Sequence, residues 1–271
     1  YKSASEIAVI FSEKSTRYMD IYYKSTLMNN LIAWMYYPEF FKLGAPFDVY
    51  LVEDLMHPNI RKDYKLYVMM NTFYLTDAEW EAVEKLKCNG KTILWFYAPG
   101  YVSNNGLSAE RIGQLTGISV EELPGKEQME ATVILSGHPL TNGLKEGYKI
   151  FSQGFTVPET VRLHPTEFGP RFRIIDNNAD IIAKFSDGKG ALAVKDFGKW
   201  KSVYSVVPRL DAQLLRNILH WAGVHVYTSD NVVFDANYNF IVLHNGYDGE
   251  KDISLTLPRK TDVYDALTNK L

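Results

Sequence analysis

Four short apolar runs dominate the first hundred residues of the chain. They cover residues 6–11, 47–52, 64–70 and 92–97, and polar or turn-forming residues bound each of them. An apolar run of this length, of which residues 7–11 are the unbroken example, is typical of a strand buried in a parallel sheet covered by helices. The spacing therefore predicts four parallel strands whose carboxyl ends share one edge of a sheet.

The segments between and after these runs carry helix signals. Residues 20–36 place apolar side chains at helical spacing, and Pro38 ends or kinks that helix. Residues that can cap a helix at its amino end predict three more helices, and these are Thr76 with Glu79, Ser108 and Asp211. Strands that alternate with helices through short loops predict a flavodoxin-like α/β domain, with a parallel sheet between two layers of helices.

From about residue 118 the pattern changes to short β-type runs separated by Gly, Pro and Asp turns. These runs cover residues 131–135, 173–175, 181–184, 191–194 and 202–206. Beyond the helix capped by Asp211, short runs at 232–234, 240–244, 253–257 and 263–264 predict an antiparallel tail. We therefore divide the chain into an α/β domain over residues 1–224 and a small β-rich domain over residues 225–271, which is too small to hold a large core alone.

The composition fits a soluble globular protein and excludes several classes of function. The 271 residues are 46% hydrophobic and 23% charged, with a formal net charge of −3, which is ordinary for such a protein. At a pI of about 6.1 the chain has no basic surface for nucleic acid or for an anionic membrane. No apolar run reaches the roughly 18 residues that a membrane span needs.

The turn after the fourth apolar run is where a nucleophile would be expected, because ligands of open α/β sheets bind just outside the strand ends. This turn, residues 97–101, reads Tyr-Ala-Pro-Gly-Tyr and contains no Cys, Ser or His. The single cysteine, Cys88, precedes the strand and so lies at its opposite end. Thiolate chemistry needs a cysteine at the turn with a histidine beside it. We therefore predict no nucleophilic catalysis, and a silent Cys88→Ala substitution.

Three stretches of the chain, taken in order, carry a resemblance to a known family. Residues 64–100 read YKLYVMMNTFYLTDAEWEAVEKLKCNGKTILWFYAPG, residues 136–144 read SGHPLTNGL, and residues 240–270 read FIVLHNGYDGEKDISLTLPRKTDVYDALTNK. Together they resemble the amidotransferase-like, trimerisation-type domain and the closing β-domain of family-42 β-galactosidases and related glycoside hydrolases. The resemblance implies a class I glutamine amidotransferase-like fold, which agrees with the flavodoxin-like sheet.

The same resemblance implies a protein portion without catalysis of its own. In that family the sugar-cleaving carboxylates lie in an upstream (β/α)8 barrel, which by itself needs about 250 residues, and nothing in this chain resembles one. The expected partners are that barrel, on the same polypeptide, and neighbouring subunits of a homo-oligomer. Because no Met or signal peptide precedes Tyr1, we expect the chain to be an excised piece.

Polar and aromatic side chains follow the predicted strand ends. Aromatic rings can stack on the faces of a sugar while polar groups bond its hydroxyls. The same edge can instead pack on a neighbouring subunit or on the barrel, and we favour this interface over the sugar. The candidate ligand or interface residues are Ser12, Glu13, Glu53, Asn71, Phe73, Tyr97, Tyr101 and Arg209.

Two of these candidates, Glu13 and Glu53, also raise the question of glycosidase chemistry. Together with Asp54 they follow strand ends, and a glycosidase needs two carboxyl groups about 5 to 9 Å apart. Acidic residues after strands are more often helix caps or solvated loop ends. We therefore predict no catalytic residue in this chain.

We also predict no metal, cofactor or phosphate site. His138, His164, His220, His225 and His244 stand singly, without the spacing of metal ligands. Glycine-rich phosphate loops are absent from the sequence, and the Asp-Gly-Lys-Gly of residues 187–190 is typical of a hairpin turn.

Two functions stay open at this point. The leading hypothesis is a non-catalytic accessory and assembly region of a multi-domain carbohydrate-active enzyme, which supports oligomerisation or shapes the active site of the barrel. The alternative is a stand-alone carbohydrate-binding or sensing protein of the same fold. The compartment also stays open between periplasmic, secreted and cytoplasmic.

Overall fold

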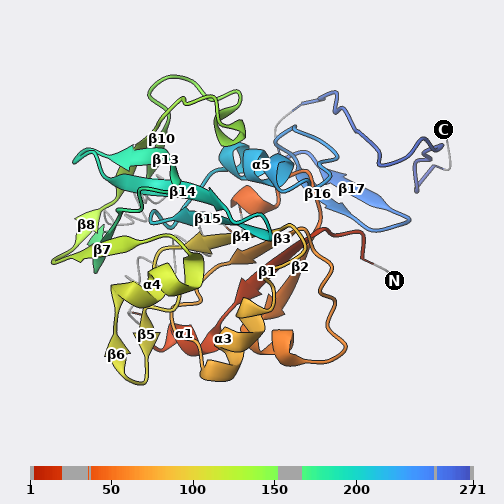
Figure 1. The fold of residues 1–271 in the computed structure, drawn as a ribbon. Helices are drawn as coiled ribbons and strands as arrows, with labels where there is room; N and C mark the ends of the chain where they lie inside the picture. The colour runs from red at the N-terminus through yellow and green to blue at the C-terminus, as the bar shows by residue number, and fades with distance from the viewer. Residues whose placement is uncertain (1–2, 20–35, 37, 152–166, 247–248, 269–271) are drawn as a thin grey trace, which may run out of the picture.

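The computed structural model describes residues 3–19, 36, 38–151, 167–246 and 249–268. These residues form a broad central β-sheet with helices on both of its faces and a small hairpin towards the carboxyl end (Figure 1). The predicted helix over residues 20–36 lies almost entirely outside the described residues.

Five parallel strands make up one half of the sheet, in the order β2-β1-β3-β4-β15. Four of them are the apolar runs of the first hundred residues, namely β1 (Ile7–Phe11), β2 (Phe47–Leu51), β3 (Leu66–Met69) and β4 (Lys91–Phe96). The fifth, β15 (Trp200–Ser205), comes from the second half of the chain and pairs with β4. This is the flavodoxin-like strand order, so the predicted fold class is confirmed.

Beyond β15 the same sheet continues with antiparallel strands. In order from β15 these are β14, β13, β9 and β10, while β12 pairs with both β14 and β7. The predicted short runs of residues 131–194 are therefore strands that extend the parallel half of the sheet, and the run at 202–206 is β15 itself. Their bounds are β7 (Val120–Leu123), β9 (Glu130–Val133), β10 (Lys149–Phe151), β12 (Arg171–Ile174), β13 (Asp180–Phe185) and β14 (Gly190–Asp196). Two short ribbons lie outside the sheet, made by β5 (Val102–Ser103) with β6 (Gly106–Leu107) and by β8 (Glu127–Gln128) with β11 (Glu167–Phe168).

Helices cover both faces of the sheet, as predicted. In Figure 1, α1 (Glu13–Thr16), α3 (Asp77–Glu84) and α4 (Ala109–Thr116) lie below the sheet and α5 (Ala212–Trp221) lies above it. The apolar stripe of α5 is buried, and it consists of Leu214, Leu215, Ile218 and Leu219. Two 3-10 turns, η2 (Val52–Met56) and η3 (Pro139–Thr141), complete these layers.

The predicted helix caps are formed at α3 and α5. The N–H of Glu79 donates to Thr76 Oγ1 at 3.3 Å, and the N–H of Thr76 donates back to Glu79 Oε2 at 2.8 Å. At α5, Asp211 Oδ1 accepts from the N–H of Leu214 at 3.0 Å. Ser108 precedes α4 as predicted, but its side chain makes no capping hydrogen bond. Two of the three predicted caps therefore satisfy backbone groups that would otherwise be left open at a helix start.

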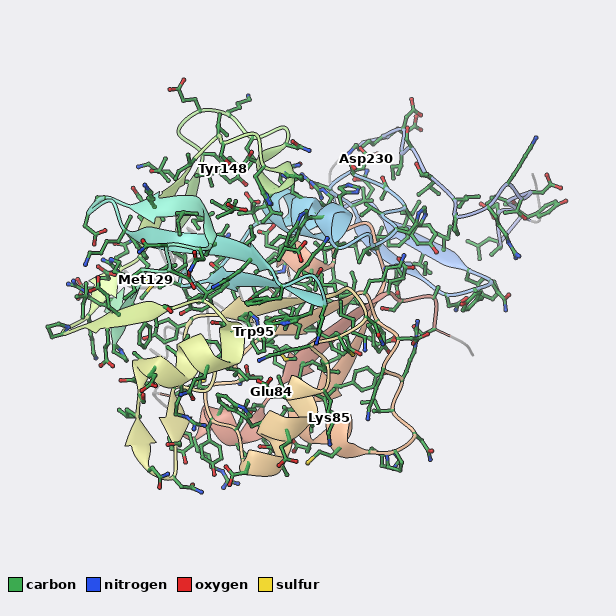
Figure 2. All side chains as sticks on the ribbon, viewed as in Figure 1. Glu84, Lys85, Trp95, Met129, Tyr148 and Asp230 are labelled. Atoms are coloured by element: carbon green, nitrogen blue, oxygen red, sulfur yellow. The ribbon has the colours of Figure 1, made fainter. Side chains whose placement is uncertain are left out.

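Trp95 of β4 lies at the centre of the sheet (Figure 2). It is a large core side chain with one polar group, the indole N–H. Its side chain is fully buried, and its indole Nε1–H donates to Ser202 Oγ of the neighbouring strand β15 at 3.2 Å. A buried indole N–H needs such a partner, because an unpaired donor in the core costs roughly 1–3 kcal/mol. The pair of Trp95 and Ser202 therefore links the two halves of the chain at the middle of the sheet.

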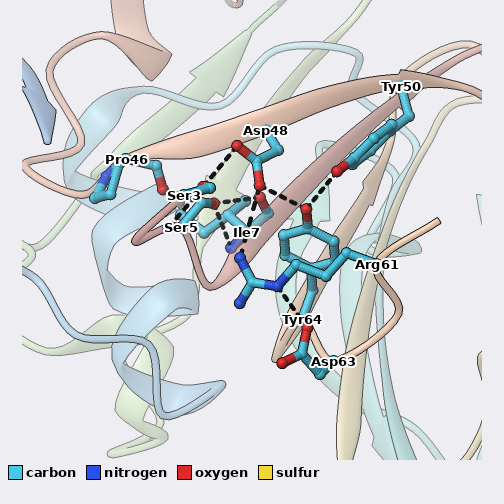
Figure 3. Close-up of polar contacts among 9 residues, drawn as sticks. All are labelled: Ser3, Ser5, Ile7, Pro46, Asp48, Tyr50, Arg61, Asp63 and Tyr64. Carbon is cyan, nitrogen blue, oxygen red and sulfur yellow. Dashed lines mark hydrogen bonds and ion pairs between the residues drawn. The ribbon is translucent and has the colours of Figure 1, made fainter. Parts of the chain in front are cut away.

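A polar network fixes the outer strand of the parallel half, β2, at its amino end (Figure 3). Asp48 accepts from the hydroxyl of Ser3 at 2.8 Å and from the hydroxyl of Tyr64 at 2.5 Å. The hydroxyls of Tyr64 and Tyr50 are 2.6 Å apart, and Arg61 Nη1 lies 3.7 Å from Asp48. Burial raises the pKa of Tyr64 above its ordinary value, so its hydroxyl stays a donor. The network ties the first described residues to β2.

The region after residue 224 is only partly the predicted antiparallel tail. A hairpin of β16 (Val233–Ala236) and β17 (Ile241–His244) is present. The predicted strands at 253–257 and 263–264 are wrong, because these residues form no ladder. Residues 253, 255 and 257 alternate towards the protein, but the hydrogen bond from the N–H of Thr256 to Tyr227 O, 2.7 Å, does not continue into further pairs. The division at residue 224 stays a prediction.

None of the helices in the described parts of the chain is long and apolar enough to cross a membrane.

The capping box of α3 can be tested against the uncapped start of α4. We expect Thr76→Ala to lower the free energy of unfolding by about 1 kcal/mol, because the N–H of Glu79 loses its acceptor. Ser108→Ala is the matched control and should cost less than about 0.5 kcal/mol. Urea unfolding followed by circular dichroism measures both. Equal losses in the two variants would contradict the assignment of the cap to Thr76.

Candidate functional site

The carboxyl ends of the five parallel strands lie along one edge of the sheet, and this edge collects the predicted site residues. Ser12 and Glu13 follow β1, Glu53 follows β2, Asn71 and Phe73 follow β3, Tyr97 and Tyr101 follow β4, and Arg209 follows β15. The topology thus gathers these residues as the sequence predicted. Their contacts decide what each of them can do.

Asn71 joins the ends of β1 and β3. Its Oδ1 accepts from the N–H of Ser12 at 2.8 Å, and its Nδ2 donates to Ser12 O at 3.0 Å. The Ser12 hydroxyl in turn accepts from the N–H and from the hydroxyl of Ser15, at 3.1 and 2.8 Å. All three side chains are buried. These polar groups therefore stabilise the strand ends of the protein itself.

The fully buried carboxylate at this edge is Glu79, which the sequence marked only as a helix cap. Burial alone would raise the pKa of Glu79, but its ion pair with Lys14 and its hydrogen bonds with Thr76 outweigh burial and lower this pKa. Glu13 is exposed in the first turn of α1. Glu53 is half-buried, and its Oε2 has no hydrogen-bond partner among the described residues. Among the described residues, no hydrogen bond links the carboxyl groups of Glu13 and Glu53.

The turn after β4 has an elbow-like backbone that begins on a tyrosine. Tyr97 has a φ of +61°, a left-handed conformation that is strained for a bulky side chain. Its N–H donates to Ser205 O at 2.8 Å, and its carbonyl oxygen accepts from the Tyr204 hydroxyl at 2.5 Å. Its own hydroxyl donates to Pro170 O at 2.6 Å. Burial raises the pKa of Tyr97 above its ordinary value, so the hydroxyl stays protonated and is a poor nucleophile.

Two of the aromatic candidates at the edge, Tyr97 and Tyr101, pack against Phe172 of β12, and Phe73 packs against Tyr97. The side chain of Tyr97 is only 3% exposed, and it meets Phe73 and Phe172 edge to face at ring-centre distances of 5.9 and 5.4 Å. Tyr101 meets Phe172 in the same way at 5.1 Å. Stacking on a sugar needs an open ring face, and these rings contribute to the core instead. A ligand or interface role for Phe73, Tyr97 and Tyr101 stays a prediction.

A buried arginine, which the sequence did not indicate, holds the strands above this edge. Arg173 of β12 donates to both carboxylate oxygens of Glu127, at 2.6 and 2.8 Å, and to Asp187 at 2.7 Å. Its guanidinium also lies 3.8 Å from the centre of the Phe185 ring. Its partners stand 46 and 14 residues away in the chain, so no local pattern marks it. Bidentate pairing of this kind fixes orientation as well as position.

Arg209 is held by a residue from outside the set of candidates. Its guanidinium is 3.6 Å from Glu39 Oε1, while Glu39 Oε2 accepts from the N–H of Ala212 at the start of α5. The side chain of Arg209 is 14% exposed. Arg209 therefore contributes to the contact between the segment before β2 and the amino end of α5.

The remaining reactive side chains do not gather at this edge. Cys88 donates to Lys85 O at 3.3 Å in the loop before β4, at the opposite end of that strand from Tyr97. His138 accepts from the N–H of Leu140 at 3.2 Å and packs on Trp221, and burial lowers its pKa. His164 lies outside the described residues. Over the ranges that the structure describes, no three His, Cys, Asp or Glu side chains are grouped as metal ligands would be.

No model of a known protein family matches the sequence, and no curated protein matches it. Solved structures do match the fold. β-Galactosidase from Bacillus circulans sp. alkalophilus matches over 90% of this chain and 34% of its own, with a TM-score of 0.56 and 17% sequence identity. A GH42 β-galactosidase from G. stearothermophilus matches over 87% of this chain and 33% of its own, with a TM-score of 0.54 and 14% identity.

A putative ThuA-like protein from Bacteroides uniformis matches more distantly, with a TM-score of 0.45 and 16% identity, over 82% of this chain and 93% of that protein. The chain spans about a third of the length of the β-galactosidases that it matches. At these identities the matches show a shared fold. The expected likeness to the amidotransferase-like region of family-42 β-galactosidases is thus confirmed for the fold.

The tyrosines at this edge predict a loss of stability at high pH. Burial, with a hydrogen bond to Glu122, raises the pKa of Tyr101 from 10.0 to about 12. Because the folded pKa lies above the unfolded one, the stabilisation by neutral Tyr101 is complete below pH 10 and is lost as the pH rises through 12. We expect Tyr101→Phe to show a shallower fall in the free energy of unfolding between pH 10 and 12. The exposed Tyr18, changed to Phe, is the control. Parallel profiles for Tyr101→Phe and the unchanged protein would contradict this assignment.

Proposed function

We propose that this chain is a carbohydrate-binding protein without catalysis of its own. The observation that carries the proposal is the elbow after β4, which holds Tyr97 where a nucleophile would stand. The Tyr97 hydroxyl is bonded to Pro170 O and kept protonated by burial. The neighbouring polar groups, Asn71 and Ser12, are bonded to each other. An edge satisfied in this way supports a protein without nucleophilic chemistry.

The ligand class comes from the shared fold. The solved structures that this chain matches are β-galactosidases, which act on sugars as their name says. A fold can host many functions, so the ligand of this chain has to be measured directly.

The experiment tests binding and turnover on the same protein. We expect isothermal titration calorimetry to detect binding of at least one neutral disaccharide among lactose, cellobiose and xylobiose. We expect no release of nitrophenol from 4-nitrophenyl β-galactoside, and no change in binding on Glu13→Gln or Glu53→Gln, since Glu13 is an exposed residue in the first turn of α1 and Glu53 lies in η2 after the outer strand β2. Robust hydrolysis that either substitution abolishes would sink the proposal.

A second candidate is the accessory and assembly region of a larger glycoside hydrolase. It is favoured by β2, which is the last strand at this side of the sheet among the described residues and exposes Val49 and Leu51. Open apolar edge strands are ready partners for another chain. The partner surface would belong to a neighbouring subunit or to the upstream barrel.

Sedimentation velocity over a range of protein concentrations tests this second candidate. If β2 mediates assembly, Leu51→Lys should weaken self-association at least about tenfold, because a charge then enters an apolar contact. Leu107→Lys is the matched control, since Leu107 is an exposed leucine on β6, away from β2. A monomeric unchanged protein, or equal effects of the two substitutions, would contradict assembly through β2.

A further inference from the structure

A cavity of about 890 Å³ opens at the amino ends of the parallel strands, opposite the edge described above. This volume falls within the roughly 300–1,000 Å³ of small-molecule sites. One wall consists of Ala4 and Pro46, which precede β1 and β2, and a second of Val224, His225 and Tyr227 after α5. The turn of the β16–β17 hairpin, residues 237–241, forms the third wall. The arm of residues 257–266 forms the fourth, with all but Lys260 at the cavity.

Aromatic rings surround the opening of this cavity. Tyr238, Phe240 and Tyr264 line it and are 57%, 52% and 54% exposed. Tyr227 lies deeper, 8% exposed, with its ring centre 4.6 Å from that of His225. At the carboxyl edge the rings are buried against one another, whereas here the side chains of Phe240 and Tyr264 are largely exposed. Exposed apolar groups gathered at one place mark binding sites more often than scattered ones do.

The polar lining of the cavity combines amide groups with charged side chains, among which carboxylates outnumber basic groups. Asn237 and Asn239 provide amide groups, and Arg259 and Asp262 carry opposite charges. Neither Arg259 nor Asp262 forms an ion pair with another described residue. Glu6 and Asp265 are already bonded within the protein, which leaves the amides and the oppositely charged Arg259 and Asp262 for a ligand. These groups favour an uncharged ligand that is rich in hydroxyls, and the excess of carboxylates disfavours an anion.

Glu6 also lines the cavity, but its carboxylate is already occupied. It forms an ion pair with Lys65 at 2.5 Å and accepts from the N–H of His225 at 2.7 Å. These contacts join the segment before β1 to the segment after α5. Two walls of the cavity are therefore fixed by the body of the protein, and the network around Asp48 holds the neighbouring Ser3 in the same way (Figure 3).

The arm is attached to this body next to the cavity. The N–H of Thr256 donates to Tyr227 O at 2.7 Å, and Thr256 O lies 2.9 Å from His225 Nε2. Beyond Thr256, the described part of the arm makes local hydrogen bonds, such as those from the N–H groups of residues 267 and 268 to Asp265. A ligand between the hairpin and the arm would thus add contacts where the chain itself makes few.

From these observations we infer that the cavity binds a neutral mono- or disaccharide, stacked on Phe240 and Tyr264 and hydrogen-bonded by Arg259 and Asp262. This inference rests on the proposed carbohydrate-binding function and assigns that binding to one cavity. The site lies at the end of the sheet opposite to the one where open α/β sheets usually bind ligands.

Calorimetry on the full chain with lactose, cellobiose and xylobiose tests the location. Phe240→Ala and Tyr264→Ala should each weaken binding roughly three- to tenfold, the size expected when one stacked ring is removed. Arg259→Gln should weaken it as well. All three side chains are largely exposed, so the thermal midpoints of the variants should stay near that of the unchanged protein. The matched control is Tyr18→Ala, an exposed ring that stacks on Tyr74 after β3.

The possible outcomes separate this inference from the proposed function. Weaker binding in the cavity variants together with a silent Tyr18→Ala supports the site. If the cavity variants bind like the unchanged protein, the site is overturned while carbohydrate binding stands. If the unchanged protein binds none of the three disaccharides, the proposed function fails and the site fails with it.

Discussion

The pairing of β15 with β4 is the constraint on which the rest of the structure depends. Six residue pairs join the two parallel strands, from Trp200 with Lys91 to Ser205 with Phe96. The buried hydrogen bond between Trp95 and Ser202 adds a side-chain link at the middle of the contact. Because β15 continues into the antiparallel strands through β14, this one ladder makes a single sheet from both halves of the chain.

The same pairing determines the character of the carboxyl edge. Ser205 O and the Tyr204 hydroxyl, both from β15, hold the backbone of Tyr97 in its strained conformation. Strain of this kind persists only where the surroundings over-determine it. Phe172 then covers the ring, and Arg173 beside it fixes that strand through Glu127 and Asp187. The place where a related fold could carry a nucleophile is here a packed junction between the halves of the sheet.

The opposite end of the sheet is built differently. Its polar groups, Asp48 and Glu6, bind the segments before β1 and after β2 to one another and leave the aromatic rings of the hairpin and the arm uncovered. A two-stranded hairpin has little core of its own, so β16–β17 depends on contacts such as the buried Phe234, whose N–H donates to Phe41 O at 2.9 Å. A cavity with hydrogen-bonded walls on one side and exposed aromatic rings on the other is suited to binding a ligand.

The sequence by itself determined the local elements, because their signals are local. Continuous apolar runs identified β1 to β4, and single polar residues such as Thr76 and Asp211 marked the helix starts. It also indicated that the turn after β4 has no nucleophile. The prediction of a strand at 253–257 was wrong for the same reason. An alternation of apolar and polar residues indicates which side chains face the protein, but not whether a neighbouring strand is present.

Only the tertiary structure decided which distant segments meet. β15 lies parallel to β4, and β14 lies antiparallel to β15. The residues of these strands do not predict either direction, because a run of β-type residues is compatible with both. The left-handed backbone of Tyr97 and the pairing of Arg173 with Glu127 likewise depend on residues far along the chain. The candidates at the carboxyl edge were gathered as the order of strands required. Whether their side chains are exposed or buried depends on packing against the second half of the chain. The residue spacing of the first half does not predict that packing.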